Sequence, residues 1–189
     1  MSDEILKLLK KTGAFMEGHF LLTSGRHSNV YIEKFRLMES PEYLDEICRK
    51  MAQKFESKKV DLVLGAATGG ILLSVGVAKY LSTIGIFTER INSKMTLRRG
   101  FKIRKNSNVL IVEDIVSTGG SILELIEVVK NNKANVIGVT SIVDRNKDIS
   151  QFHSNYKPLL RFPIESWSPD SLPDWLEEIP LTQRGRSGK

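Results

Sequence analysis

The chain has 189 residues, of which 41% are hydrophobic and 26% are charged, so it is long and apolar enough to bury the core of one domain. This composition excludes a disordered chain, a collagen-like fibre and a disulfide scaffold. The formal net charge of +6 fits acidic small ligands, phosphates or nucleic acid, and it does not choose among them.

Cysteine usage and the lack of long apolar runs indicate the cellular environment. With Cys48 as the single cysteine, an intrachain disulfide and a cysteine-based zinc site are excluded, in agreement with a reducing cytoplasm. No apolar run approaches the roughly 20 residues that cross a bilayer. The first residues, MSDEILKLLKK, also lack the apolar stretch and cleavage site of a signal peptide. We therefore expect a soluble cytoplasmic protein with no membrane partner.

The N-terminal part of the sequence predicts a short helix, a strand pair and a longer helix. Apolar residues share one helical face over 3–11, and strand-like pieces flank a turn at Ser24-Gly25 within 18–34. Ser40-Pro41-Glu42 is typical of a helix start, because it combines an N-cap serine, a proline at the first position and an early acid. The buried face of that helix is predicted to hold Leu44, Ile47, Met51 and Phe55, with Cys48 beside them as a small core residue.

The middle of the chain alternates short apolar runs with helical segments. Strands are predicted over 60–64, 84–88, 109–112 and 136–143, and helices over 70–81 and 121–131. A polar stretch, 89–108, interrupts this pattern. Repeated strand–helix–strand units favour an α/β fold with a mainly parallel, twisted sheet flanked by helices. The part from Gln151 onward lacks clear periodicity, and its last residues, QRGRSGK, are expected to be mobile.

The loop GAATGG (65–70) leads from a predicted strand directly into a helix. Small residues let backbone amides approach an anion, and the helix N-terminus adds unpaired N–H groups and a favourable dipole. The loop lacks the GK[ST] of a Walker A motif and the GxGxxG spacing of a dinucleotide fold. By itself it fits an ordinary strand-to-helix turn equally well.

The segment VLIVEDIVSTGGS (109–121) is a more specific signal. Glu113 and Asp114 are expected at the carboxyl end of a strand, where two like charges repel unless cations or hydroxyl donors balance them. The following STGGS supplies hydroxyls and amides at a helix N-terminus, which suits a phosphate monoester. A ligand that carries hydroxyls and a phosphate together, such as a ribose 5-phosphate, satisfies both parts. The alternative is a solvated acidic turn followed by an ordinary helix cap.

These two loops resemble those of the type I phosphoribosyltransferases. The resemblance implies that Glu113 and Asp114 hold the ribose 2′- and 3′-hydroxyls of phosphoribosyl pyrophosphate (PRPP). It assigns the 5-phosphate to Ser117, Thr118, Gly119, Gly120 and Ser121, and the diphosphate to the backbone of Ala67, Thr68 and Gly69. Many members have a second Asp where this chain has Glu113, a departure that preserves the charge.

Further segments are similar to the orotate phosphoribosyltransferase subfamily: GHFLLTSGRHS (18–28), FTER (87–90), LRRGF (97–101) and VDR (143–145). The resemblance covers roughly residues 10 to 150 and implies transfer of phosphoribose to orotate, giving orotidine 5′-monophosphate and pyrophosphate. Orotate is an anion, and Arg145 offers a permanent cation for its carboxylate. Ser117 falls where the family loop touches the base. Tyr31 either presents an aromatic face to the ring or packs in the core.

The basic stretch RINSKMTLRRGF (90–101) matches a mobile family loop that crosses a dimer interface. The resemblance makes Arg90 and Lys94 stabilisers of the diphosphate, with Lys94 as the main catalytic lysine and Asp114 alongside it in catalysis. Two departures are Ile91, where a second lysine is common, and Thr96, at the histidine position. The loop is also shorter, so Arg98, Arg99 and Lys102 are further candidates for binding the phosphates. A solvated basic face is the alternative for each cation.

The resemblance also implies a Mg²⁺ cofactor, a homodimer and a division of the chain. Magnesium is expected to be bound through PRPP, near Glu113 and Asp114, and no residue is assigned as a direct metal ligand. The expected units are a helix and hood segment at 1–40, a catalytic core at 41–150 and a C-terminal segment at 151–189, with the hood formed from both chain ends. The role of the basic tail, 184–189, and any association with the next pathway enzyme stay open.

Two rival functions share part of the pattern. A purine phosphoribosyltransferase would keep the sugar-phosphate loops, but neutral purines do not call for the permanent charge of Arg145. A regulatory protein that binds nucleic acid would fit the net charge of +6, but no helix-turn-helix segment is left over in the sequence. Anionic substrates alone explain the charge, so we expect no nucleic-acid partner.

Overall fold

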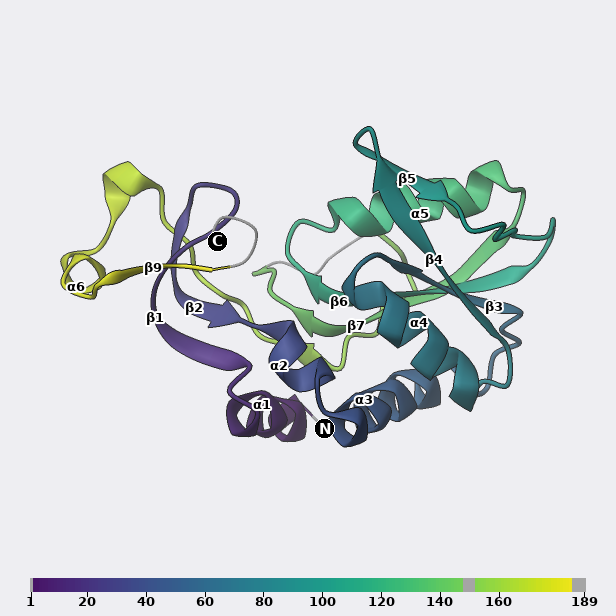
Figure 1. The fold of residues 1–189 in the computed structure, drawn as a ribbon, viewed down its shortest axis with the longest axis horizontal. Helices are drawn as coiled ribbons and strands as arrows, with labels where there is room; N and C mark the ends of the chain where they lie inside the picture. Colours follow the sequence, from purple (N-terminus) through teal and green to yellow (C-terminus); the bar gives the residue numbers. More distant parts are fainter. Residues whose placement is uncertain (1, 148–151, 185–189) are drawn as a thin grey trace.

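The computed structural model describes residues 2–147 and 152–184 and folds the chain around two β-sheets (Figure 1). The first elements are α1 (Ser2–Lys11), β1 (Phe15–Leu21), β2 (His27–Ile32) and α2 (Lys34–Met38). The core elements are α3 (Pro41–Gln53), β3 (Leu62–Ala66), α4 (Gly69–Tyr80), β4 (Ile84–Ile91), β5 (Lys94–Leu97), β6 (Asn108–Val116), α5 (Gly120–Asn131) and β7 (Asn135–Asp144). The last are β8 (Leu160–Arg161), a 3₁₀ turn (Pro169–Ser171), α6 (Asp174–Glu177) and β9 (Leu181–Gln183).

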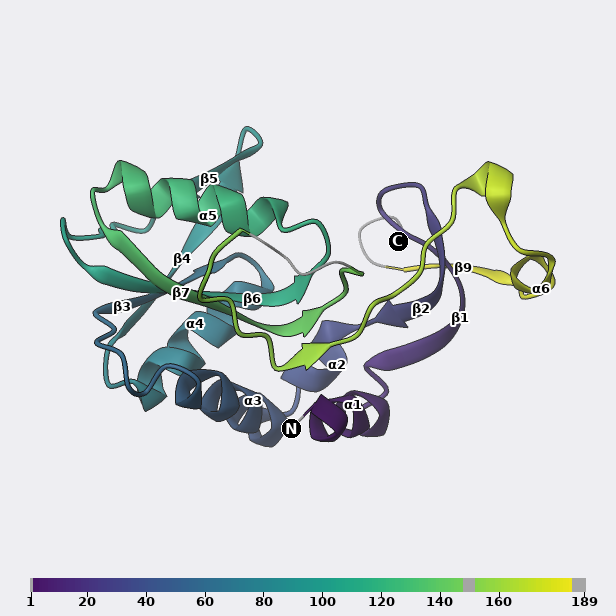
Figure 2. The ribbon, with the colours of Figure 1, turned by 180° about the vertical axis from the view of Figure 1, so that it is seen from behind.

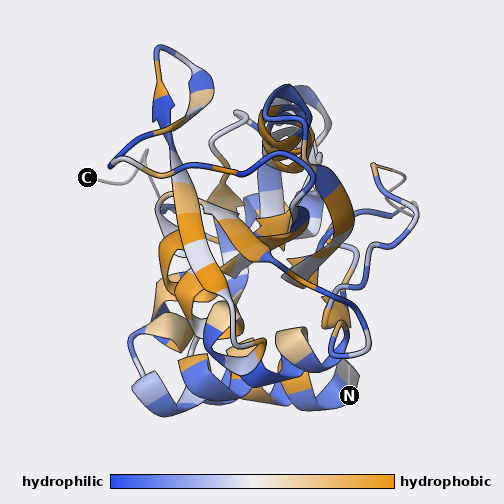
Figure 3. Cartoon of the chain, turned by 90° about the vertical axis from the view of Figure 1, so that its right-hand side faces the viewer, coloured by the Kyte–Doolittle hydropathy of each residue, from blue (hydrophilic) through white to orange (hydrophobic). Residues whose placement is uncertain are grey.

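The larger sheet has the strand order β5-β4-β3-β6-β7-β8 and is parallel except for the β4–β5 pair. Helices α3 and α4 cover one face and α5 covers the other (Figure 2). Side chains of β6 alternate between the two layers: Leu110 and Val112 pack toward α3 and α4, whereas Val109 and Ile111 pack toward α5. The central strands are therefore apolar on both faces, in keeping with the hydrophobic colouring of core strands in Figure 3, and the predicted α/β fold is confirmed.

The smaller sheet, which we call the hood, joins both ends of the chain in the order β2-β1-β9. Strands β1 and β2 form an antiparallel hairpin, and β9 pairs with β1 in parallel through His19 to Leu21. Buried imidazoles strengthen this connection, because His19 lies 2.6 Å from His27 and its Nδ1 lies 3.0 Å from the carbonyl oxygen of Ile179. The expected hood formed from N- and C-terminal segments is confirmed.

Three features differ from the sequence prediction. Strand β6 continues to Val116 because it pairs with β7 as far as Asp144, so the acidic pair lies inside the strand rather than after it. The polar stretch 89–108 contains the end of β4, the turn and β5 of a hairpin, and the turn residues Asn92 and Ser93 both adopt positive φ. Helix α2 and strand β9 lack the apolar periodicity that would have predicted them.

The ends of several predicted elements shift by one or two residues. The strand expected over 60–64 is β3 at Leu62–Ala66, and the helix expected over 70–81 is α4 at Gly69–Tyr80. The tail expected to be mobile lies mostly outside the described residues, which end at Arg184. None of the helices in the described ranges combines the length and apolar character needed to cross a lipid bilayer.

Candidate active site

The candidate site lies where the parallel strands of the core end. The carboxyl ends of β3, β6 and β7 meet at the sheet edge that is directed toward the hood (Figure 1). The segments that follow these strands hold three of the predicted groups: the loop 67–69, the loop 117–119 and Arg145. Ligands of open α/β sheets bind at such an edge.

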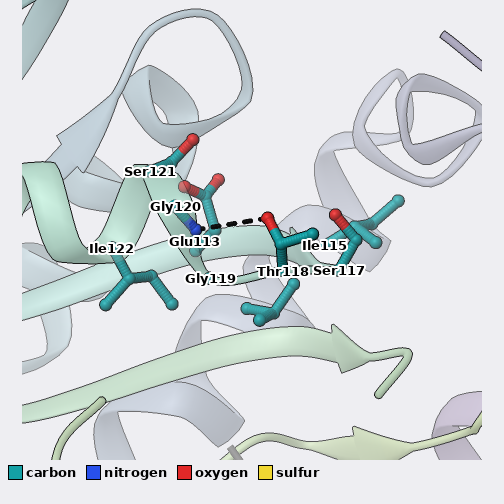
Figure 4. A pocket seen from close by; sticks show the side chains of 9 residues that line it. Glu113, Ile115, Ser117, Thr118, Gly119, Gly120, Ser121 and Ile122 are labelled. Carbon is teal, nitrogen blue, oxygen red and sulfur yellow. Dashed lines mark hydrogen bonds between the residues drawn. The ribbon is translucent and has the colours of Figure 1, made fainter. Parts of the chain in front are cut away.

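The loop between β6 and α5 forms a small cavity of about 50 Å³. It is lined by Glu113, Ile115, Val116, Ser117, Thr118, Gly119, Gly120, Ser121 and Ile122. Gly119 has φ of 78°, and the N–H of Gly120 donates to the Thr118 hydroxyl over 3.4 Å. Figure 4 shows the Ser117 and Thr118 hydroxyls and the Glu113 carboxylate on the same side of this loop, with Ile122 directed away. The structure thus brings the predicted phosphate loop and one predicted acid together.

The two acids point to opposite faces of the sheet because they are consecutive residues of one strand. Glu113 lines the cavity and is 8% exposed, whereas Asp114 is 5% exposed and lies against the start of α4. The Glu113 carboxylate accepts the backbone N–H of Asp114 at 3.0 Å, and the Asp114 carboxylate accepts that of Ile115 at 2.6 Å. Burial, reinforced by the negative charge of Asp114, raises the pKa of Glu113 above its ordinary value.

The β3–α4 loop brings backbone very close to the acidic strand. A Cβ atom at Gly69 would lie 1.9 Å from Oδ2 of Asp114, and one at Gly65 would lie 2.2 Å from the carbonyl oxygen of Gly70. The peptide bond between Ala67 and Thr68 is cis. Thr68 is exposed and Ala67 is half-buried, and Thr68 makes no side-chain cap within the described structure. The Thr68 side chain therefore leaves the first amides of α4 uncapped.

Arg145 follows β7 and lies partly buried, with its backbone N–H donating to the carbonyl oxygen of Val116 at 2.8 Å. Burial lowers the pKa of its guanidinium, and the proximity of Tyr31 opposes this effect. Its Nε is fully buried and has no hydrogen-bond partner among the described residues. Since a guanidinium stays charged, a buried N–H without a partner favours an anionic ligand at this point. Tyr31 lies on β2, so the hood and the core both contribute here.

The cations expected to act on the diphosphate lie on and just after the β4–β5 hairpin, and several are exposed or paired with acids of the same chain. Arg90 forms a two-pronged contact with Glu124 of α5 at 2.8 and 2.9 Å, and Arg99 pairs with Glu89 at 2.8 Å. Lys94 and Arg98 are exposed, and Lys102 is an exposed residue of a groove between β5 and α5. Neither Arg90 nor Lys94 lines the cavity at α5 among the described residues, since Arg90 is paired with Glu124 and Lys94 is exposed at the start of β5.

Sequence reasoning missed Lys34, which starts α2 directly after the hood strand β2. Its Nζ lies 2.5 Å from Oδ2 of Asp114, 80 residues away in the chain. No local motif marked this lysine, because its partner lies 80 residues away on strand β6 of the larger sheet. The only signal in the sequence was indirect: two adjacent acids need a nearby cation, without any indication of which lysine or arginine supplies it.

Comparisons with known proteins agree with this arrangement. Residues 36–168 match the phosphoribosyl transferase domain family. The chain is 41% identical to an orotate phosphoribosyltransferase of Desulforamulus reducens, over 97% of this chain and 96% of that protein. It is 42% identical to an orotate phosphoribosyltransferase of Thermotoga maritima, over 97% and 98% of the two chains. This chain belongs to the orotate phosphoribosyltransferase family.

A solved structure supports the same family at the level of the fold. The crystal structure of an orotate phosphoribosyltransferase from Aeropyrum pernix superposes with a TM-score of 0.65 at 27% identity. The match covers 83% of this chain and 93% of that chain. The resemblance inferred from the two loops and the GHFLLTSGRHS segment is therefore confirmed.

Proposed function

We propose that this chain transfers the 5-phosphoribosyl group of PRPP to orotate, giving orotidine 5′-monophosphate and pyrophosphate in pyrimidine biosynthesis. The observation that carries this proposal is the cavity at the start of α5, where a buried carboxyl group lies beside hydroxyls and the amino end of a helix. Hydroxyl and phosphate recognition are thereby combined in one small site. Family membership supports the same reaction.

The sugar and its phosphates are assigned to the two strand-to-helix loops. We assign the ribose hydroxyls to Glu113 and Asp114, and the 5-phosphate to the loop 117–121 at the amino end of α5. The diphosphate is assigned to the backbone of 67–69, at the amino end of α4. Both helix ends present amides and positive dipole ends toward anionic oxygens.

The base is assigned to the space between the hood and the core. Arg145 offers a guanidinium with a buried, unsatisfied Nε, which suits the carboxylate of orotate. Tyr31 is half-buried, which raises the pKa of its hydroxyl, and the nearby positive charge of Arg145 opposes this rise. We therefore assign the Tyr31 ring to a position beside the base. Ser117 is exposed at the end of β6 and would contact the base from the phosphate side.

Transfer builds positive charge on the anomeric carbon of the ribose and negative charge on the departing diphosphate. Orotate is already an anion, so the reaction needs no strong protein base. The loops at α4 and α5 hold the sugar diphosphate in line with the base, which lowers the entropy cost of reaction. Backbone amides and hairpin cations stabilise the leaving group as its charge grows.

The hairpin cations are assigned to this last role, with Lys94 as the main catalytic lysine and Arg90 as its partner. Arg90 must exchange Glu124 for the diphosphate, because the carboxylate fills its guanidinium fork in the free chain. Arg98, Arg99 and Lys102 are the other candidates. We expect Lys94→Ala to lower kcat more than it raises KM, and equal rates in variant and wild type would move the role to the arginines.

Magnesium is proposed as the cofactor. Among the described residues there is no cluster of three or more His, Cys, Asp or Glu side chains that could hold a metal ion. Hard oxygen donors are nevertheless present in Glu113 and Asp114, near the proposed position of the ribose. The residues therefore fit a cation that is bound mainly through PRPP oxygens and water. When bound, it would neutralise charge on the diphosphate.

A cytoplasmic homodimer is proposed as the functional state, with the hairpin shared across the interface. Leu72 and Val75 lie one helical turn apart on α4 and are 43% and 57% exposed, which suits burial against a second copy. Light scattering on the purified chain tests the dimer, and a monomeric mass at micromolar concentration would contradict it. Cys48 is buried and unpaired, in keeping with a reducing compartment.

An absorbance assay of orotate consumption with PRPP and Mg²⁺ tests the reaction. Hypoxanthine, guanine, adenine and uracil are assayed in parallel. Turnover of orotate alone would support both the sugar site and the role of Arg145. Turnover of another base instead would keep the sugar site and refute the base assignment. Asp114→Asn should weaken PRPP binding, and unchanged affinity would refute the ribose assignment.

A further inference from the structure

We propose that Lys34 is a positioning residue, which holds the Asp114 carboxylate in place for the ribose of PRPP and offsets its charge. The inference rests on the proposed function, because it takes Asp114 as a ribose-binding acid. It adds a residue from the junction of hood and core to a site otherwise built from core loops.

The contact between the two side chains is short and partly shielded from water. Lys34 Nζ lies 2.5 Å from Oδ2 of Asp114, and the two side chains are 30% and 7% exposed. The ammonium also lies 5.4 Å from the centre of the Phe35 ring, on the same helix. An ion pair with one nearly buried partner is screened less than the fully exposed pairs on the surface.

Lys34 completes a set of contacts that fixes the Asp114 side chain. Oδ1 accepts the backbone N–H of Ile115 at 2.6 Å, and Oδ2 is held by Lys34. The start of α4 closes a third side, since a Cβ at Gly69 would lie 1.9 Å from Oδ2. Without the lysine, Oδ2 loses its cation while the strand and the helix start remain in place.

The charge balance of the site gives this contact its functional consequence. Glu113 and Asp114 are adjacent and both nearly buried, and the proposed ligand is itself a polyanion. Removing the cation leaves an unpaired carboxylate facing incoming phosphates, and like charges repel strongly where water is excluded. Loss of Lys34 should therefore weaken PRPP binding more than orotate binding.

The test compares Lys34→Met and Lys34→Arg with the matched control Lys79→Met. Lys79 also pairs with an aspartate at 2.8 Å, but that partner, Asp45, lies on α3. The Lys79 side chain is 66% exposed. Kd for PRPP is measured by titration calorimetry with Mg²⁺, and KM for each substrate is measured by orotate consumption. Melting temperatures show whether each variant folds, and Lys34→Gln replaces Lys34→Met if the latter does not.

We expect Lys34→Met to raise Kd and KM for PRPP about fivefold, and KM for orotate less than twofold. Lys34→Arg should recover most of the loss, and Lys79→Met should leave both constants unchanged. In an Asp114→Asn background, Lys34→Met should change the PRPP affinity less than twofold, because the lysine then has no carboxylate to offset.

Several results would overturn the proposal. These are an unchanged PRPP affinity in Lys34→Met, an equal rise of both KM values, or an Arg variant as impaired as the Met variant. If the wild type binds PRPP but does not transfer its phosphoribosyl group to orotate, the proposed function fails. The PRPP affinities measured by calorimetry still decide the role of Lys34 in that case. If the wild type binds no PRPP, both proposals fail.

Discussion

Replacing Gly65 by alanine should separate strand β3 from the start of helix α4. The new Cβ would lie 2.2 Å from the carbonyl oxygen of Gly70 and 2.8 Å from its carbonyl carbon, whereas ordinary contact begins at 3.4 Å. The helix start must therefore move by about 1.2 Å, the difference between 3.4 and 2.2 Å. No change of rotamer relieves the clash, because the obstructing atoms belong to the backbone.

The cost follows from how tightly this helix is packed. Inserting a methyl group into a well-packed interior typically costs about 1–3 kcal/mol in the free energy of unfolding. Both backbones at this contact are buried, and α4 packs against β3, β4 and α3, so we expect about 3 kcal/mol. For a chain of this size, that corresponds to a melting temperature lower by about 6–12 °C.

Thermal and urea unfolding of Gly65→Ala and of the control Gly120→Ala would measure this effect. A Cβ at Gly120 meets nothing closer than 3.7 Å, so the control adds the same methyl group at the start of a helix without a clash. KM for PRPP should also rise in Gly65→Ala, because the shift moves the proposed diphosphate loop. A loss below about 0.5 kcal/mol, or an equal loss in both variants, would refute the reasoning.

Three further predictions concern buried groups. The raised pKa of Glu113 means that the folded state holds its proton to higher pH than the unfolded state, so this residue should make the free energy of unfolding fall as pH rises above 4.5. Glu113→Gln should flatten that fall in urea titrations across pH 4–9, and an unchanged slope would contradict the assignment. Burial raises the pKa of the Cys48 thiol to about 12, so a thiol reagent at pH 8 should react only on unfolding; rapid modification of the folded chain would refute this. Ile111→Ala should lower the free energy of unfolding by about 2–5 kcal/mol, because the side chain is fully buried in a central strand. A loss below about 0.5 kcal/mol in urea unfolding, as is usual for surface positions, would contradict a core on both faces of the sheet.

Much of the core was predictable because its signals are local. Apolar runs and helical stripes alternate along the chain, and the residues proposed to bind phosphates lie together in each strand-to-helix loop. The segment 117–121 illustrates this, since β6 and α5 flank it directly and the cavity forms from neighbouring residues. A contiguous motif retains its geometry wherever the strand and the helix form.

The hairpin shows where local signals gave an incomplete description. The strand predicted over 84–88 is present, but the polar stretch after it lacks periodicity, and there β4 continues to Ile91 and pairs with β5 after a two-residue turn. The family resemblance assigned Arg90 to the diphosphate, and the fold pairs it with Glu124 across 34 residues. Strand pairing and ion pairing both depend on the partner that the fold brings near, which a single segment does not specify.

The sequence by itself determined the α/β class, the adjacent acids, the family and the position of the two loops that we propose bind anions. Each of these depends on residues that are neighbours in the chain. Only the tertiary structure decided that Glu113 and Asp114 face opposite sides of the sheet, that Lys34 neutralises Asp114, and that β9 returns to complete the hood. The opposed acids follow from the pairing of β6 with β7, which keeps both residues inside one strand. The other two features arise from contacts between segments about 80 and 160 residues apart, where proximity is created by folding rather than by sequence spacing.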